Sequence, residues 1–288
     1  MRLVILSTHG RRDRKNQIGV PRTRRECNRR RVVVLTRLGE GEERYEIERS
    51  HFDSVAEVEQ SEGPIFETLS PVLIEKHIVP RLGDIEGKRV VECGCGTGQL
   101  LAKIAERGAE THGFDLSEGM VALAKRNLSA RGFDHVTLQA MTLEHMTYQS
   151  ETFDMVVGVA VLHHTDLAES RKEVRRILKT GGRGVFFEPM RGNPIIALFR
   201  TLTPKIRTPT EVPFSVQDIR FFTEPFTHRQ SQEIYFTGLA SLALLALFRS
   251  RRLFDLASWF TDPVDRFLVR TFPFLRRLCG FTVIEVTR

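Results

Sequence analysis

The sequence predicts an α/β fold in which helices cover both faces of a mostly parallel sheet. Three observations support this prediction. Short apolar segments alternate with amphipathic segments between residues 89 and 188, which is the pattern of repeated strand–helix units. A glycine-rich turn, Gly94–Gly98, follows the first apolar segment. The length of 288 residues and the hydrophobic fraction of 41% suit one catalytic domain with additions.

The net charge of +7 comes from the N-terminal residues. Residues 1–31 hold eleven Lys or Arg and two acids, and Glu40–Glu62 then holds nine acids and two bases. Because such an asymmetry is typical of a flexible arm, we expect residues 1–50 to form an arm and residues 51–288 to form the folded domain. A basic arm can contact nucleic acid or an anionic surface, so these partners stay open.

The four cysteines form no even disulfide framework, so we expect reduced thiols and a cytoplasmic protein. Cys93 and Cys95 flank glycines of the turn, and no second Cys or His pair stands at the spacing of a zinc site. We therefore interpret them as small side chains that fit the turn, and we expect no metal site. The other two cysteines are Cys27 and Cys279.

The expected elements follow one another in a regular order. Pro64–Leu82 has apolar residues at helical intervals and predicts a helix that is interrupted near Pro71. Helices are also expected at Gln99–Arg107, from Ser117 to Ala130 and at Leu167–Leu178. The expected strands are Arg89–Cys93, Glu110–Asp115, Val136–Gln139, Phe153–Val159 and Arg183–Glu188.

The carboxyl-terminal third differs in composition, since fifteen of the twenty phenylalanines lie from Phe186 onward. Residues 190–225 are rich in Pro, Thr and Arg and predict a loop-rich cap. Thr227–Phe236 and Phe281–Val286 predict two strands, and residues 237–278 predict an apolar helical insertion between them.

The apolar run within residues 237–278 is followed by arginines. As a helix it would be about 18 Å long, against about 30 Å for the bilayer core, so it cannot cross a membrane alone. Three alternatives stay open for it: a core helix, a dimer face or a peripheral contact with the membrane surface. The sequence predicts no oligomeric state.

The turn Glu92-Cys-Gly94-Cys-Gly96-Thr-Gly98 indicates which kind of cofactor to expect. Its glycines permit positive φ and close approach of a ligand to the backbone, and the next helix presents free N–H groups. A dinucleotide loop would have its third glycine at position 99, which is Gln99. Glu92 would repel a pyrophosphate but suits a cationic amino acid moiety. The turn therefore favours a sulfonium amino acid cofactor over NAD.

This turn resembles motif I of the class I S-adenosylmethionine-dependent methyltransferases, (D/E)-x-G-x-G-x-G. The segments FDMVVGVAVLHH and ILKTGGRGVFFEP resemble the fourth strand, the glycine turn and the fifth strand of that family, and the match covers about residues 85–190. The likeness is to small-molecule and lipid-type members such as the type 11 group. It implies a Rossmann-like seven-stranded sheet with an antiparallel last strand, and S-adenosyl-L-methionine as the cofactor.

The resemblance also implies the residues that bind the cofactor. Asp115 corresponds to the acid that holds the ribose hydroxyls. Thr142 stands where the family often has an Asp that binds the adenine amino group, and its hydroxyl can still accept a hydrogen bond. The full implied set is Glu92, Gly94, Gly96, Gly98, Asp115, Leu116, Thr142, Leu143 and Val159.

The residues after the fourth strand usually face the methyl group, and here they include His163 and His164. The sequence lacks the tetrad of adenine-N6 enzymes, the Pro-Cys pair of cytosine-C5 enzymes and the double-glutamate loop of arginine methyltransferases. We therefore expect O- or C-methylation of an apolar or amphiphilic small molecule. Either histidine is a candidate general base, and Glu188 is a candidate ligand-facing residue at the end of a strand.

Two other functions stay open. One is methylation of RNA or another nucleic acid through the basic arm, and the other is a non-catalytic cofactor-binding partner protein. We expect the acceptor to lie beneath residues 190–225 and 237–278. Ligands of open α/β sheets lie outside the carboxyl ends of the strands, and these segments hold most of the phenylalanine.

Overall fold

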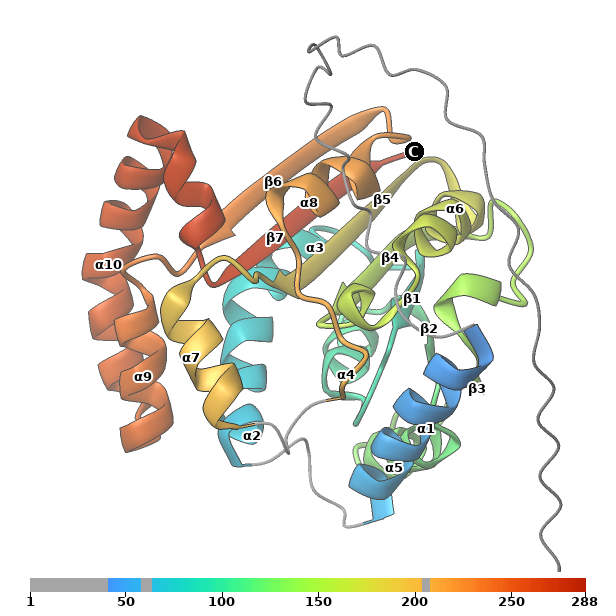
Figure 1. The fold of residues 1–288 in the computed structure, drawn as a ribbon. Helices are drawn as coiled ribbons and strands as arrows, with labels where there is room; N and C mark the ends of the chain where they lie inside the picture. Colours follow the sequence, from blue (N-terminus) through green and yellow to red (C-terminus); the bar gives the residue numbers. More distant parts are fainter. Residues whose placement is uncertain (1–40, 58–63, 204–207) are drawn as a thin grey trace, which may run out of the picture. The chain divides into compact units, whose positions relative to one another are not determined.

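The computed structural model describes residues 41–57, 64–203 and 208–288, all within the compact unit Arg37–Arg288. This unit is built on a seven-stranded sheet with the order β3-β2-β1-β4-β5-β7-β6 (Figure 1). β7 runs antiparallel to β5 and β6, whereas the pairs formed by β1 to β5 are parallel. The predicted seven-stranded mixed sheet is confirmed.

The strand bounds follow the apolar segments of the sequence. β1, β2 and β4 coincide with the prediction, and β3 is shifted by one residue. β5 begins at Leu178 rather than at Arg183, because the chain passes directly from the preceding helix into the sheet. The strands are β1 Arg89–Cys93, β2 Glu110–Asp115, β3 Thr137–Ala140, β4 Phe153–Val159, β5 Leu178–Pro189, β6 His228–Ile234 and β7 Phe281–Thr287.

Alternation of side chains along the central strands supplies two hydrophobic cores, one on each face of the sheet. Val91 and Cys93 of β1 belong to one core and Val90 to the other. The first core is covered by α6 (Leu167–Ile177) and α8 (Val216–Thr223). The second is covered by α4 (Gln99–Ala105), residues 69–82, α9 (Leu239–Phe248) and the start of α10 (Arg251–Thr271).

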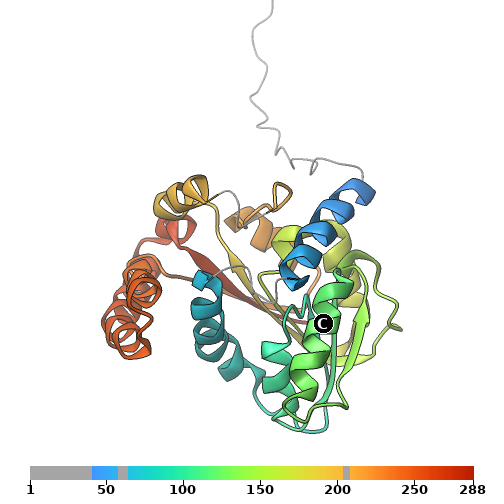
Figure 2. The ribbon, with the colours of Figure 1, turned by 90° about the horizontal axis from the view of Figure 1, so that it is seen from below.

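Residues 41–50 belong to a helix, so the predicted arm does not extend to residue 50. This helix, α1, is Gly41–Glu57, and it packs against α5, Glu118–Ser129 (Figure 2). The sequence hides it because its inward face carries the charged residues Arg44 and Glu48 instead of an apolar stripe. Residues 1–40 lie outside the described residues, and the arm remains a prediction there.

The helical segment after residue 64 is interrupted later than predicted. α2, Pro64–Leu73, continues past Pro71 into a π-helical turn, η1 (Ile74–Ile78), and then into α3, Val79–Leu82. The N–H of Val79 bonds to the carbonyl oxygen of Ile74, and Pro80 has no N–H with which to continue a regular α-helical ladder. The distortion therefore belongs to the turn before Pro80.

The carboxyl-terminal insertion has the predicted place, between β6 and β7. It consists of α9, α10 and a 3₁₀ segment, η5 (Pro273–Leu278), and α9 and α10 pack against each other (Figure 1). Residues 190–225 hold more helix than predicted, since α7 (Pro194–Leu202) and α8 both lie there. Among the described residues, no helix combines the length and the apolar character that crossing a membrane requires.

Candidate active site

A cavity lies at the carboxyl ends of β1, β2 and β4, where ligands of such sheets bind. Eight of the nine predicted cofactor residues line it. Gly98 is the exception: it caps the start of α4 with φ +81 and does not line the cavity. The predicted cofactor residues that line it are Glu92, Gly94, Gly96, Asp115, Leu116, Thr142, Leu143 and Val159.

The glycine turn is shaped by close packing and by one carboxylate. A Cβ on Gly94 would lie 2.6 Å from Val161, and its φ of +65 also disfavours a side chain. Gly96 has φ +48, and a Cβ there would meet nothing within 4 Å. Asp115 accepts the Gly96 N–H at 2.9 Å and the Ser117 N–H at 3.0 Å. The Asp115 carboxylate therefore fixes the glycine turn in a conformation that leaves the backbone at Gly96 accessible from the cavity.

Two buried polar atoms of the predicted cofactor residues have no hydrogen-bond partner among the described residues. These atoms are Glu92 Oε2 and Thr142 Oγ1. Burial and the neighbouring Asp115 hold the pKa of Glu92 well above its usual range. Since a buried polar group without a partner costs free energy, both atoms are fitted to receive a ligand. A cationic group beside Glu92 would favour its ionised form.

The cavity is acidic. Its described lining includes the carboxylates of Glu48, Glu92, Asp115 and Glu144 and contains no Lys or Arg. Arg44 approaches Glu144 at 2.5 Å from behind the wall. Such a lining suits an ammonium or sulfonium ligand and opposes a phosphate-rich one. The residues therefore fit the amino acid and sulfonium groups of S-adenosylmethionine.

The roof of the cavity differs from the prediction. We expected residues 190–225 and 237–278 to cover the site, but none of the residues that the structure describes in either segment lines this cavity. The cover comes from α1, with Tyr45, Glu48 and Phe52 on one face of the helix, and from Ser70 and Ile74 of the next helical segment. Since α1 packs across α5, its inward face is held over the glycine turn.

The cap segment nevertheless reaches the edge of the site. Thr208 and Thr210 both donate hydrogen bonds to Glu48, the former at 2.8 Å. The Val212 N–H donates to the His163 carbonyl oxygen at 2.8 Å. These contacts fix α1 to the loop after β4. No local pattern in the sequence predicts these contacts, because they join residues far apart in the chain.

Glu188 and His163 lie behind the cavity wall rather than in it. Glu188 is fully buried and accepts the N–H groups of Val161 at 3.1 Å and Leu162 at 2.8 Å. It also contacts Nδ1 of His163 at 2.8 Å. Burial alone would lower the pKa of His163, but the carboxylates of Glu188 and Glu211 outweigh burial and raise it to about 9. In this arrangement His163 carries its proton at neutral pH.

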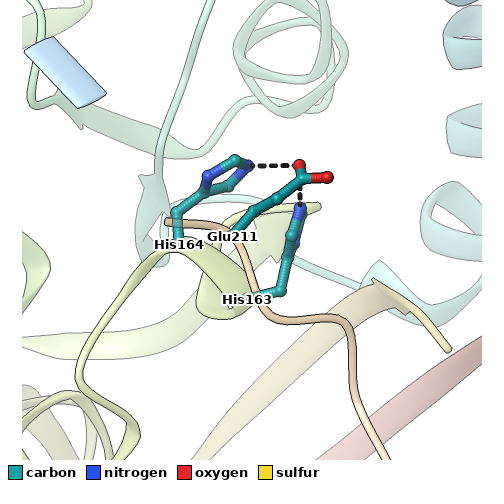
Figure 3. A group of neighbouring side chains, drawn as sticks. All are labelled: His163, His164 and Glu211. Atoms are coloured by element: carbon teal, nitrogen blue, oxygen red, sulfur yellow. Dashed lines mark ion pairs between the residues drawn. The ribbon is translucent and has the colours of Figure 1, made fainter. Parts of the chain in front are cut away.

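His164 is the predicted histidine that lines the cavity. Its Nδ1 lies 3.0 Å from Glu48 Oε2. Its Nε2 lies 4.0 Å from Glu211 Oε2, and Nε2 of His163 lies 3.7 Å from the same oxygen (Figure 3). Ligand atoms of these three residues all lie within 4.8 Å of one another, so they form a group that could hold a metal ion. The sequence analysis expected no metal and missed Glu48 and Glu211.

Comparisons with known proteins agree with this geometry. A family model described as a methyltransferase domain matches residues 90–182. A ubiquinone biosynthesis O-methyltransferase of Alkalilimnicola ehrlichii is 30% identical over 145 residues, which are 50% of this chain and 58% of that protein. A demethylmenaquinone methyltransferase of Chlorobaculum parvum is 32% identical over 133 residues, 42% of this chain and 53% of that protein. The chain thus spans little more than half the length of these relatives.

Solved structures share the fold. The geranyl diphosphate C-methyltransferase of Streptomyces coelicolor A3(2), a complex with S-adenosyl-L-homocysteine, has a TM-score of 0.52 at 14% identity, over 77% of this chain and 78% of that chain. A Haemonchus contortus phosphoethanolamine N-methyltransferase 2, bound to S-adenosyl-L-methionine, has 0.53 at 16% identity, over 77% and 52%. The fold is that of the class I methyltransferases. Residues 90–182, which the methyltransferase-domain model matches, run from β1 to the start of β5 of this fold.

Proposed function

We propose that this chain transfers a methyl group from S-adenosyl-L-methionine to oxygen or carbon of an apolar or amphiphilic small molecule. The observation that carries the proposal is the acidic cavity at the glycine turn, with the unpartnered oxygens of Glu92 and Thr142 in its wall. The names of the matched relatives support an acceptor of the quinone type. Nucleic acid is a poor acceptor for this site, since no Lys or Arg is among the described residues of the lining.

When bound, the cofactor supplies a methyl group activated by a positively charged sulfur. The residues of the chain then bind the cofactor, orient it toward the acceptor and exclude water from the cavity. Glu92 faces the amino group, Asp115 the ribose, and Thr142 and Leu143 the adenine. Phe52, Ile74 and Phe114 supply the apolar part of the wall. His164 is the proposed catalytic residue at the acceptor, whereas His163 and Glu188 are positioning residues behind it.

Calorimetry with S-adenosyl-L-methionine tests the cofactor site directly. Glu92→Gln keeps the shape of the side chain but removes its charge, so we expect affinity to fall about 10- to 100-fold, as for the loss of a hydrogen bond to a charged group. The matched control is Glu110→Gln, at the exposed start of β2. Equal affinity of the wild type and the Glu92 variant would reject this assignment.

Turnover with labelled cofactor tests the acceptor class. We expect label to enter amphiphilic phenols or quinols, and not RNA. His164→Gln should slow transfer about 100-fold or more while cofactor affinity stays unchanged, because this histidine is assigned to the acceptor side. Label that entered RNA alone would overturn the proposed acceptor.

We further infer that the chain docks on an anionic membrane surface through α10. The outward face of this helix is apolar, with Trp259 and Phe267 exposed by 70% and 65%. The remaining exposed members of this apolar stripe are Leu253, Leu256, Phe260 and Val264.

Charge supports the membrane as the partner of this stripe. Residues 249–277 hold seven arginines and three aspartates. The aspartates are engaged within the protein: Asp255 pairs with Arg251, Asp262 pairs with Lys76, and Asp265 is buried. An apolar stripe with tryptophan and surrounding arginine suits the interface of an anionic bilayer.

Flotation with vesicles tests the docking surface. Full-length protein should bind vesicles of phosphatidylcholine with phosphatidylglycerol and bind pure phosphatidylcholine weakly. The double variant Trp259→Gln/Phe267→Gln should lose about tenfold or more in partitioning with unchanged stability, because both side chains are exposed. Phe221→Gln, an exposed aromatic on α8, is the matched control. A dimer in sedimentation that the double variant dissolves, without vesicle binding, would refute the membrane assignment.

A further inference from the structure

The geometry points to a divalent transition-metal site formed by His163, His164 and Glu211, at the edge of the cavity that His164 lines. Nε2 of each histidine faces the same carboxylate oxygen of Glu211, at 3.7 and 4.0 Å (Figure 3). A tetrahedral ion with bonds of about 2.0–2.1 Å needs ligand atoms about 3.4 Å apart. The two Nε2–Oε2 distances exceed this spacing by only about 0.3 and 0.6 Å, and all three ligand atoms lie within 4.8 Å of one another.

The surroundings of the histidines match those of metal ligands. A metal-bound histidine usually presents its second ring nitrogen to a carboxylate, which fixes the tautomer and the ring orientation. His163 presents Nδ1 to Glu188 at 2.8 Å, and His164 presents Nδ1 to Glu48 at 3.0 Å. Both supporting carboxylates are buried. The two Nε2 atoms are thereby left to face Glu211 together.

The carboxylate of Glu211 is supported in the same way. Its Oε1 pairs with Arg200 at 2.5 Å, while its Oε2 faces the histidines. Ligating carboxylates are commonly held by such an outer hydrogen bond. The three side chains have exposed fractions of only 5%, 14% and 8%, so an ion there would be shielded from bulk water. Their donor set of two imidazoles and one carboxylate suits Zn²⁺, Fe²⁺, Mn²⁺ or Co²⁺ better than Mg²⁺ or Ca²⁺.

Electrostatics favours an ion between these groups. The two imidazole rings are only 4.0 Å apart, so two protonated rings would repel each other. The carboxylates of Glu48, Glu188 and Glu211 are all largely buried around them. One divalent cation, together with the Arg200 guanidinium paired with Glu211, would balance the three carboxylates while both rings are neutral.

The site has a chemical use that rests on the proposed function. His164 lines both the cavity and the ion site, so a hydroxyl of the acceptor would reach an open position on the ion. Coordination would release the hydroxyl proton to solvent. The oxygen would then attack the methyl carbon: an O–C bond forms, the S–C bond breaks, and its electron pair stays on sulfur.

Metal titration of the chelator-treated full chain tests the inference without any turnover. Co²⁺ and Zn²⁺, followed by absorption spectroscopy and calorimetry, should each bind with one equivalent, and Mg²⁺ should bind far more weakly. Glu211→Gln should weaken Zn²⁺ binding about tenfold or more, and so should Glu48→Gln, which removes only the outer carboxylate. The matched control is Glu224→Gln, which makes the same change at an exposed glutamate. This variant should bind Zn²⁺ as the wild type does.

The two ways of failing can be told apart. No stoichiometric binding, or equal affinity in the Glu211 variant, would mean an ionic cluster of protonated histidines and would overturn the inference. Chelated protein that still binds S-adenosyl-L-methionine normally would leave the proposed function standing in that case. Metal binding without methyl transfer to any acceptor would instead contradict the proposed function.

Discussion

Helices α1 and α10 differ in the kind of residue that they bury and the kind that they expose. α1 turns charged and polar groups inward, where Arg44 and Glu48 are buried, and its outer face is acidic. α10 buries Phe254 with Ser258 and Asp265 and exposes its apolar stripe. The inward face of α1 therefore lines the cavity, whereas the outward apolar face of α10 is the surface proposed to dock on a membrane. Amphipathicity alone does not tell which face is the functional one.

The largest effect should follow from breaking the inner face of α1. Arg44 pairs with Glu144 at 2.5 Å, and their side chains have exposed fractions of 6% and 3%. Arg44→Ala leaves a buried carboxylate without its cation, so the free energy of unfolding should fall by about 3–5 kcal/mol in urea titrations. Arg49→Ala, whose pair with Glu46 on the same helix is exposed, should change it by less than about 0.5 kcal/mol. Equal losses in the two variants would mean that α1 is not docked by this pair.

The inner face of α10 should give the next largest effect. Phe254 is fully buried and belongs to the second hydrophobic core, on the face of the sheet that α9 and α10 cover. Phe254→Ala should lower the free energy of unfolding by about 3 kcal/mol, through lost burial and the cavity left behind. The comparison is Phe260→Ala on the outer face, exposed by 59%, which should cost less than about 0.5 kcal/mol. A large loss in the Phe260 variant would show that the stripe is covered within the protein itself.

A buried histidine next to the α10 region sharpens the comparison through pH. His77 of η1 contacts the Tyr235 hydroxyl at 2.7 Å, next to Lys76, which pairs with Asp262 of α10. Burial, with Lys76 and Arg81 nearby, lowers the pKa of His77 from 6.5 to about 3. The folded pKa is depressed, so this contribution to stability is complete above pH 6.5 and is lost as pH falls toward 3.

The measurement is the free energy of unfolding at pH 5.5 and at pH 4.5. Each proton taken up only by the unfolded chain costs about 1.4 kcal/mol of stability per pH unit. The wild type should lose about that much more over this interval than His77→Gln, which keeps a partner for Tyr235. His228→Gln, at an exposed position on β6, should follow the wild type. Parallel pH curves for the wild type and the His77 variant would disprove the assignment.

The parts of the molecule that the sequence predicts are those determined locally. The strand β1 and the turn at Glu92–Gly98 follow from a short apolar run and from glycine spacing, and both are found as expected. The cap Ser117 accepts the Met120 N–H, as its position before a helix predicts. Local rules suffice there because each residue acts on its close neighbours in the chain.

The rest depends on contacts that the sequence does not encode locally. Glu48 meets Thr208 and His164, and Glu211 meets His163, across long stretches of chain. The acidic residues that follow the basic stretch predict an arm up to residue 50, although residues 41–50 belong to α1. In α10, periodicity reveals the apolar stripe, but only packing decides whether the stripe points inward or outward. The prediction that residues 237–278 cover the cavity is wrong for that reason, since the apolar stripe of α10 points outward.

The smallest effect concerns how α1 is held in place over the cavity. Asp53 of α1 accepts the Gly119 N–H at 3.1 Å and the Ser117 hydroxyl at 2.5 Å, at the N-terminus of α5. A carboxylate there satisfies a free N–H group and interacts favourably with the helix dipole. Asp53→Ala should therefore cost about 1 kcal/mol of unfolding free energy, against no measurable change for the exposed Ser54→Ala. In the Asp53 variant, hydrogen exchange should also rise in α1 but not in α10, because Asp53 joins α1 to the start of α5 and does not contact α10. Uniform exchange in both helices would show that α1 has no separate attachment, and would remove this difference between the two regions.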